Sequence, residues 1–96
     1  MDSETQLLQS SEEWGNAHIT VNTLLSEVLN TLRDHGYNPG YHVSYDRMEQ
    51  HLVIEDKILQ QVPRLSEQYS AYLSACQRRD KALTEIQQVP KLRVNL

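Results

Sequence analysis

Apolar residues recur along the first third of the chain at the alternating three- and four-residue spacing of one helical face. This seam consists of Leu7, Trp14, Val21, Leu25, Val28 and Leu32. The spacing predicts an α-helix over about residues 16–35, with Ser3 as an alternative beginning. Gly36 can adopt the left-handed conformation that ends a helix, so we expect the helix to end near His35.

Residues 36–43 are predicted to form a turn between two helical patterns. Within it, Asn38-Pro39-Gly40 combines the fixed φ of proline with the conformational freedom of glycine, which is typical of a chain reversal. Ser44 follows as the expected N-cap. A second helix is therefore predicted to begin near Tyr45.

A second and broader apolar stripe extends from this turn to Ile86. It keeps its phase across Pro63, although a proline inside a helix removes one hydrogen bond and clashes with the preceding turn. The pattern predicts one long helix over about residues 45–88 that is kinked at position 63; the alternative is a three-helix bundle broken there. The predicted fold class is all-α, with residues 1–96 forming a single domain, an antiparallel helical hairpin with coiled-coil-like packing.

The two predicted helices differ greatly in length. A helix over residues 45–88 would be about 66 Å long, whereas one over residues 16–35 would be about 30 Å long. The shorter helix cannot cover the broad stripe of the longer one, and an exposed apolar surface of this kind indicates an association site. We therefore predict partner binding at stripe residues and at two apolar residues of the C-terminal tail. These positions are Leu52, Leu59, Val62, Leu65, Tyr69, Tyr72, Leu73, Leu83, Ile86, Leu92 and Val94.

The C-terminal tail, residues 89–96, differs in pattern from the helical segments. Val89-Pro90 ends the second helix, and apolar residues then alternate with polar ones. The apolar positions are Leu92, Val94 and Leu96, and the polar positions are Lys91, Arg93 and Asn95. Alternation of this kind is typical of a strand, so we expect the tail to bind a partner as an extended segment.

Composition limits the compartment and the class of partner. The chain is 39% hydrophobic and 23% charged, which is enough for one packed core. Cys76 is the only cysteine, no N-terminal apolar run resembles a signal peptide, and no segment approaches the length of a membrane span. These features predict a cytoplasmic or nuclear protein. A net charge of -4 opposes phosphate neutralisation and disfavours nucleic-acid binding.

No motif indicates catalysis, a metal site, a cofactor or a small-molecule substrate. The four histidines at positions 18, 35, 42 and 51 lack the spacing of a metal site, and Cys76 is expected to be a small buried residue. Tyr37, Tyr41 and Tyr45 recur every four residues around the bend. We expect these rings to pack over the end of the helical pair, and the alternative is that they anchor a partner.

The expected function is that of a non-enzymatic protein–protein interaction subunit or scaffold that assembles into a larger complex through helical packing. Charge pairs beside the stripe are sparse, so they do not distinguish a homo-oligomer from a hetero-oligomer; a hetero-oligomer is favoured slightly. Two alternatives are a helical nucleic-acid-binding dimer and a small chaperone or inhibitor that masks a helix of its target.

Overall fold

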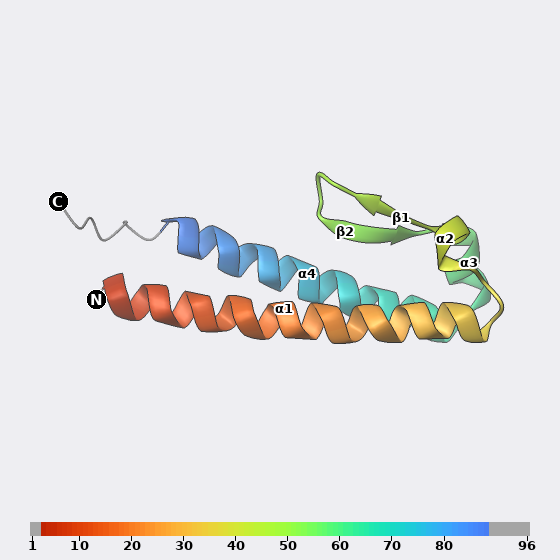
Figure 1. Ribbon diagram of the computed structural model, residues 1–96, viewed down its shortest axis with the longest axis horizontal. Coiled ribbons are helices and arrows are strands. Elements are labelled where there is room, and N and C mark those ends of the chain that lie inside the picture. Colours follow the sequence, from red (N-terminus) through yellow and green to blue (C-terminus); the bar gives the residue numbers. More distant parts are fainter. Residues whose placement is uncertain (1–2, 89–96) are drawn as a thin grey trace.

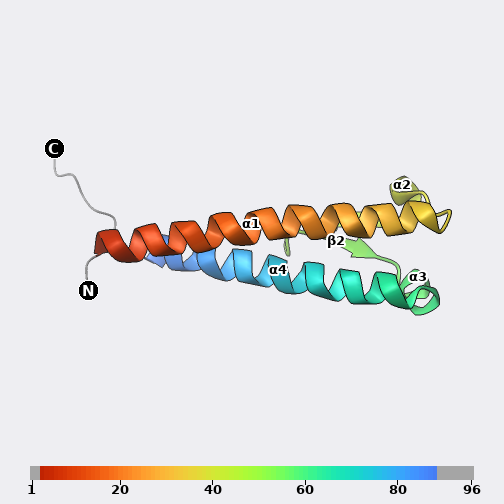
Figure 2. The same cartoon turned by 90° about the horizontal axis from the view of Figure 1, so that it is seen from below.

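The computed structural model describes residues 3–88, which form two long antiparallel helices joined by a corner that carries a β-hairpin (Figure 1). The elements are α1 (Ser3–Asp34), α2 (Pro39–His42), β1 (Val43–Asp46), β2 (His51–Ile54), α3 (Asp56–Gln61) and α4 (Pro63–Gln88). α1 and α4 lie side by side, as the view turned by 90° also shows (Figure 2). The structure is mostly helical, as predicted, but the all-α class is not exact because the chain also contains an antiparallel strand pair.

α1 begins at Ser3, the alternative predicted beginning, and ends at Asp34, one residue before the predicted end near His35. Its C-terminus is closed by two hydrogen bonds of 3.0 Å, from the Gly36 N–H to the Arg33 carbonyl and from the Tyr37 N–H to the Leu32 carbonyl. Gly36 has a φ of 81°, in the left-handed region that favours glycine. The predicted glycine stop is therefore confirmed, in the form of a Schellman motif.

The predicted turn over residues 36–43 contains one short helix. The Asn38 side chain accepts a hydrogen bond of 2.9 Å from the Gly40 N–H, and Pro39 occupies the first helical position. A proline fits there because its missing N–H would have no partner inside the helix. Asn38 thus acts as the N-cap of α2, and the chain enters β1 directly after this single helical turn.

The prediction of a helix beginning near Tyr45 is wrong for residues 45–55. β1 and β2 pair in antiparallel fashion, and Ser44, the expected N-cap, lies within β1. Met48 lies in the loop that connects the two strands and is 91% exposed. The register pairs Val43 with Ile54, Ser44 with Val53, Tyr45 with Leu52, and Asp46 with His51.

Pro63 separates two helices instead of kinking one. Val62, between α3 and α4, has an extended backbone with a φ of -126° and a ψ of 90°. Pro63 is the first residue of α4, where a proline removes no helical hydrogen bond. The predicted kink is therefore wrong and the alternative break at this position is confirmed, although α3, with six residues, is too short to be the third helix of a bundle.

The core lies where the two long helices meet the hairpin. Its most deeply buried large side chains are Val28, Leu32, Leu65 and Cys76, contributed by α1 and α4. Ile54 of β2 is 3% exposed and belongs to the same cluster. The apolar stripe on α4 is therefore broad because α4 packs against both α1 and the hairpin.

The predicted mismatch in helix length does not exist. α1 has 32 residues and α4 has 26, which correspond to about 48 Å and about 39 Å. α1 is long enough to accompany α4 over its whole length. The apolar stripe of α4 is thus covered within the chain, and the argument from helix length for a partner no longer applies.

Candidate interaction surface

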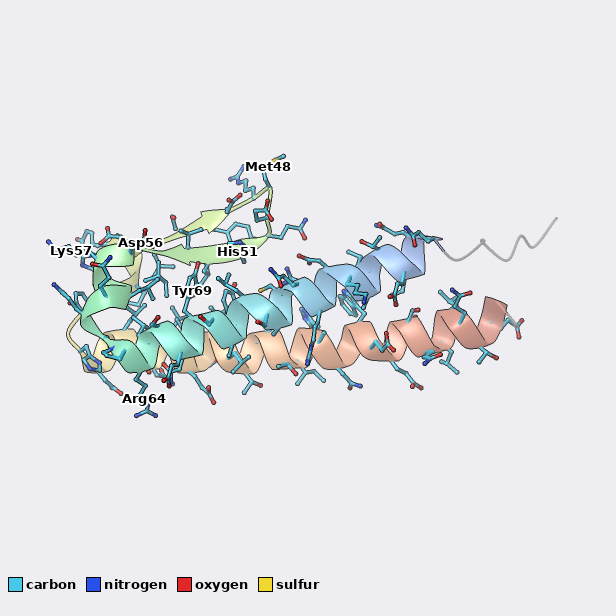
Figure 3. The ribbon with its side chains drawn as sticks, turned by 180° about the vertical axis from the view of Figure 1, so that it is seen from behind. Met48, His51, Asp56, Lys57, Arg64 and Tyr69 are labelled. Carbon is cyan, nitrogen blue, oxygen red and sulfur yellow. The ribbon has the colours of Figure 1, made fainter. Side chains whose placement is uncertain are left out.

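Residues 41–54, here called the arm, project from the corner and run back along α4 (Figure 1). The main chain of Leu52 fastens the arm to this helix. Its N–H donates to the Tyr72 hydroxyl at 2.9 Å, and its carbonyl accepts from the Tyr69 hydroxyl at 2.8 Å. Tyr69 is directed from α4 toward the arm (Figure 3). Because the two tyrosines are three residues apart, they lie on one face of the helix and can both reach β2.

Burial raises the pKa of both of these hydroxyls, which already carry their protons at neutral pH. It raises the pKa of Tyr72 to about 12. It also raises the pKa of Tyr69, an effect that a hydrogen bond with the backbone of Ile54 partly offsets. The Tyr69 hydroxyl therefore stays a donor to Leu52 to a higher pH than an exposed tyrosine would.

The loop between the strands is fastened at both of its ends. Arg79 of α4 donates from Nη2 to the Gln50 carbonyl at 2.8 Å. Asp46 accepts hydrogen bonds from the backbone N–H groups of Met48 and Glu49 at 2.9 and 3.1 Å. These contacts hold the loop in one conformation, with Met48 at its tip and directed away from the helices (Figure 3).

The base of the arm is fastened by contacts at the corner. The Tyr37 hydroxyl donates to the side-chain carbonyl of Gln61 at 2.7 Å. The His42 ring lies edge-on to the Tyr37 ring at 5.4 Å, and its Nδ1 lies 3.3 Å from a carboxylate oxygen of Glu55. The arm is thus tied to the corner at one end and to Arg79 at the other.

Exposed apolar side chains gather on the arm. Tyr41 is 81% exposed, Tyr45 57%, Met48 91% and Val53 37%. The other large apolar side chains that are exposed among residues 3–88 are Leu8, Ile19 and Leu83, which are spread over the two long helices. An ordered hairpin that presents several apolar side chains to water is typical of a surface that binds another molecule.

Of these residues, Tyr45 and Val53 lie in the strands, and their side chains are on different faces of the hairpin, because successive residues of a strand point to opposite sides. Leu52 and Ile54 face the core, so Val53 and its register partner Ser44 face outward. Together with Tyr41, Val53 and Ser44 line a shallow recess of about 150 Å³. Tyr45 is opposite Leu52 and lies on the core-facing side, at the outer edge of β1.

Within residues 3–88, the N–H and the carbonyl of Tyr45, at the outer edge of β1, have no hydrogen-bond partner. In an antiparallel ladder, two opposite residues direct their N–H and carbonyl groups either toward each other or away from each other. Leu52 directs both groups to α4, so Tyr45 directs its own N–H and carbonyl away from β2. This edge is therefore able to accept a further strand.

Most of the predicted partner-binding residues pack within the chain. Val62, Leu65, Tyr69 and Tyr72 are buried, and Leu52, Leu59 and Leu73 are partly buried against the same core. Leu83 is 38% exposed and Ile86 is partly buried. Leu92 and Val94, like the whole predicted tail strand, lie outside the described residues. The buried positions cannot contact a partner in this conformation.

The tyrosines around the bend have different environments. Tyr37 packs against the core as expected, but the prediction is wrong for Tyr41 and Tyr45, which are exposed. Their four-residue spacing in a loop was the sequence signal for this surface.

Cys76 is 1% exposed, as predicted. Among residues 3–88, no group of three or more histidine, cysteine, aspartate or glutamate side chains is arranged to hold a metal ion.

A larger groove, of about 470 Å³, lies between α1 and α4 at the opposite end of the molecule from the corner. Its lining consists of Glu13, Asn16, Ala17, Arg78, Lys81, Ala82 and Glu85. Two carboxylates and two cations share the groove, so the lining favours neither an anion nor a cation. Arg79, which lies between Arg78 and Lys81 in the sequence, donates to the Gln50 carbonyl of the arm.

Comparisons with protein-family models, with curated proteins and with solved structures found no match to this chain. Within residues 3–88, no helix is both long enough and apolar enough to cross a membrane.

Proposed function

We propose that this chain is a non-enzymatic protein–protein interaction subunit that binds its partner through the outward face and the tip of the arm. The contact residues in this proposal are Tyr41 and Val53 at the recess and Met48 at the tip. The two long helices act as a rigid support for the arm. The single observation behind the proposal is that apolar side chains are exposed on a hairpin that three hydrogen bonds fasten to α4.

The order of the arm before binding favours its affinity for a partner. A mobile loop loses conformational entropy when it binds, and this loss reduces its affinity. The arm is already fixed by Tyr69, Tyr72 and Arg79, so the apolar area of Tyr41, Met48 and Val53 can be buried without that cost. Tyrosine and methionine are both enriched at protein interfaces. The recess has room for about one apolar side chain of a partner.

The proposal is tested by affinity capture with quantitative mass spectrometry. The immobilised chain is compared with a double variant, Tyr41→Ser with Val53→Thr, which removes apolar area from the recess but keeps a β-branched residue in β2. The control is Leu8→Ser with Ile19→Ser, because these residues of α1 are 62% and 64% exposed and lie outside the arm. Circular dichroism verifies that all three proteins are folded.

We expect one or more proteins to be retained by the unmodified chain and by the α1 control, and to be lost with the recess variant. If the recess variant retains the same proteins as the control, the arm is not the binding surface. We further propose that the partner is a different protein, in which case the isolated chain is a monomer by light scattering. A dimer that dissociates in the recess variant would instead identify the partner as a second copy.

A further inference from the structure

The outer edge of β1 offers backbone groups that can recognise an extended partner segment. We infer that the partner of the arm contributes such a segment and that it pairs with β1 in antiparallel fashion, as an added strand of the two-stranded sheet. This inference rests on the proposed function, because it assigns the form and the chemistry of the segment that the arm binds. The site consists of the Tyr45 backbone, the recess beside Ser44 and the carboxylate of Asp46.

The edge is accessible because the arm is fastened to α4 through its other strand. Leu52 of β2 makes both of its hydrogen bonds to α4, so β2 lies between α4 and β1 (Figure 1). Tyr45, at the outer edge, is 57% exposed. Its N–H and carbonyl have no hydrogen-bond partner within residues 3–88. A free donor and a free acceptor on an ordered strand form a template for a further strand.

The hydrogen-bonding capacity of the edge favours an antiparallel segment. The Val43 N–H already donates to the Pro39 carbonyl, so Tyr45 is the residue of β1 that offers both of its backbone groups outward. One residue opposite Tyr45 satisfies both groups in an antiparallel pair, whereas a parallel strand forms slanted bonds from two residues. The residue two positions further along the segment can then donate to the Val43 carbonyl. A short antiparallel segment therefore uses every free backbone group of this edge.

The core-facing side of β1 determines two residues of the segment. Val43 and Tyr45 share this side with Leu52 and Ile54, their register partners in β2. Segment residues opposite Val43 and Tyr45 are on the same side and should be apolar, because cross-strand neighbours pack against each other. The residue opposite Tyr45 would cover part of its exposed ring, and this burial favours binding.

The recess determines the residue between these two. Ser44 points to the outward face, and a segment residue opposite it lies on that face with its Cα about 4.5 Å from the Ser44 Cα. The recess of about 150 Å³ is lined by Ser44, Tyr41 and Val53, among others. Because the serine side chain is small, an apolar side chain opposite it can extend across Ser44 into the recess. The strand edge and the recess of the proposed function therefore form one site.

Asp46 determines the charge at the beginning of the segment. Its Oδ1 accepts hydrogen bonds from the N–H groups of Met48 and Glu49, which hold the carboxylate in place. The segment residue opposite Asp46 precedes the one opposite Tyr45, and a cation there is favoured because opposite charges attract across strands. The partner segment thus consists of a lysine or arginine followed by three apolar residues.

NMR titration of the full chain with a synthetic peptide tests the inference. The peptide is blocked at both ends, and its residues are serine, lysine, valine, leucine, valine and threonine in that order. Its lysine, first valine, leucine and second valine are designed to lie opposite Asp46, Tyr45, Ser44 and Val43. At saturation we expect the peptide to slow hydrogen exchange of the Tyr45 N–H by about tenfold or more, and to leave exchange of the Val28 N–H within about twofold.

Two control peptides separate the backbone pairing from the charge. Proline in place of the first valine removes the N–H that donates to the Tyr45 carbonyl, so we expect this peptide to bind at least about tenfold more weakly. Glutamate in place of lysine places a like charge opposite Asp46, and we expect binding to weaken by about three- to fivefold. Equal affinities of the valine and proline peptides would overturn the inference, and equal affinities of the lysine and glutamate peptides would overturn the assigned charge.

A pair of variants tests the same hydrogen bonds from the side of the chain. Tyr45→Pro removes the outward N–H, which an edge strand tolerates, whereas Tyr45→Val keeps it, and both variants lose the ring. Protection of the Val53 amide, which is directed toward β1, verifies that the hairpin is intact in each. We expect Tyr45→Pro to bind the peptide at least about tenfold more weakly than Tyr45→Val does. Equal affinities of the two variants would overturn the inference.

Failure of the inference and failure of the proposed function give different results. If the recess variant loses its captured proteins but the peptide leaves the Tyr45 N–H unprotected, the proposed function stands and the inference fails. If the recess variant keeps those proteins and the peptide still protects the Tyr45 N–H, the recess surface fails and the strand edge stands. Protection of the Tyr45 N–H without peptide that increases with protein concentration would show that a second copy occupies the edge, which would overturn the inference.

Discussion

Replacement of Tyr72 by phenylalanine should loosen the arm without unfolding the helices. The Tyr72 hydroxyl accepts the hydrogen bond from the Leu52 N–H at 2.9 Å, and phenylalanine keeps the ring while removing this acceptor. The ring itself is 3% exposed, so its packing in the core is retained. The substitution therefore isolates one of the three hydrogen bonds between the arm and α4.

The expected cost follows from the environment of Leu52. A hydrogen bond contributes about 0.5 to 1.5 kcal/mol net, and a buried donor that is left without an acceptor costs about 1 to 3 kcal/mol. Leu52 is partly buried, so water can replace the hydroxyl in part. We expect the free energy of opening the arm to fall by about 1 to 2 kcal/mol, which corresponds to about 5- to 30-fold faster exchange of its protected amides.

Amide hydrogen exchange resolved by NMR separates the arm from the helices. The amides that connect β1 and β2 should exchange faster in Tyr72→Phe, whereas the amides of Val28 and Leu32 in the middle of the core should change little. Tyr41→Phe is the matched control, because Tyr41 is 81% exposed and its hydroxyl has no hydrogen bond within the described part of the chain. If both variants exchange alike in the arm, the Tyr72 contact does not hold the arm in place.

Three further predictions concern stability and are measured by chemical denaturation. Leu65→Ala should lower the free energy of unfolding by about 2 to 5 kcal/mol, since this side chain is 0% exposed, whereas Leu83→Ala, at 38% exposed, should cost less than about 1.5 kcal/mol; equal losses would contradict the assigned core. Gly36→Ala should cost about 1 kcal/mol because its φ of 81° disfavours a side chain, and no loss would exclude the glycine stop. The pKa of Tyr72 is raised to about 12, so the folded state binds this proton more tightly than the unfolded state. The contribution of this proton to the free energy of unfolding is therefore complete below about pH 10 and declines as the pH rises toward 12. In Tyr72→Phe the free energy of unfolding should decline less steeply over that range.

The sequence determined the long helices and the position of the first helix end. In α1, Val21, Val28 and Leu32 repeat on one face, and this period predicts a helix whichever neighbour covers the face. Gly36 determines the stop because few other residues adopt its left-handed conformation. Both signals are local, so they could be recognised without knowledge of the tertiary structure.

The interaction surface was only partly visible in the sequence. Tyr41 and Tyr45 were unusual as aromatic residues in a bend, but the pattern gave no measure of their exposure. For Leu65 and Tyr72, the apolar stripe predicted burial but did not indicate which neighbour covers them. Whether a stripe residue faces a partner or its own chain depends on where the rest of the chain lies.

The tertiary structure decided the conformation of residues 45–54. The spacing of apolar residues in this segment resembled that of the following helix. Asp46 to Gln50 includes good helix formers, and local preference alone did not select a hairpin. The hairpin forms where the hydroxyls of Tyr69 and Tyr72 bind the main chain of Leu52 from α4, 17 and 20 residues away. Such contacts exist only after both segments are in place, so no local pattern encodes them, whereas the turn of a helix and its glycine stop are encoded within a few residues.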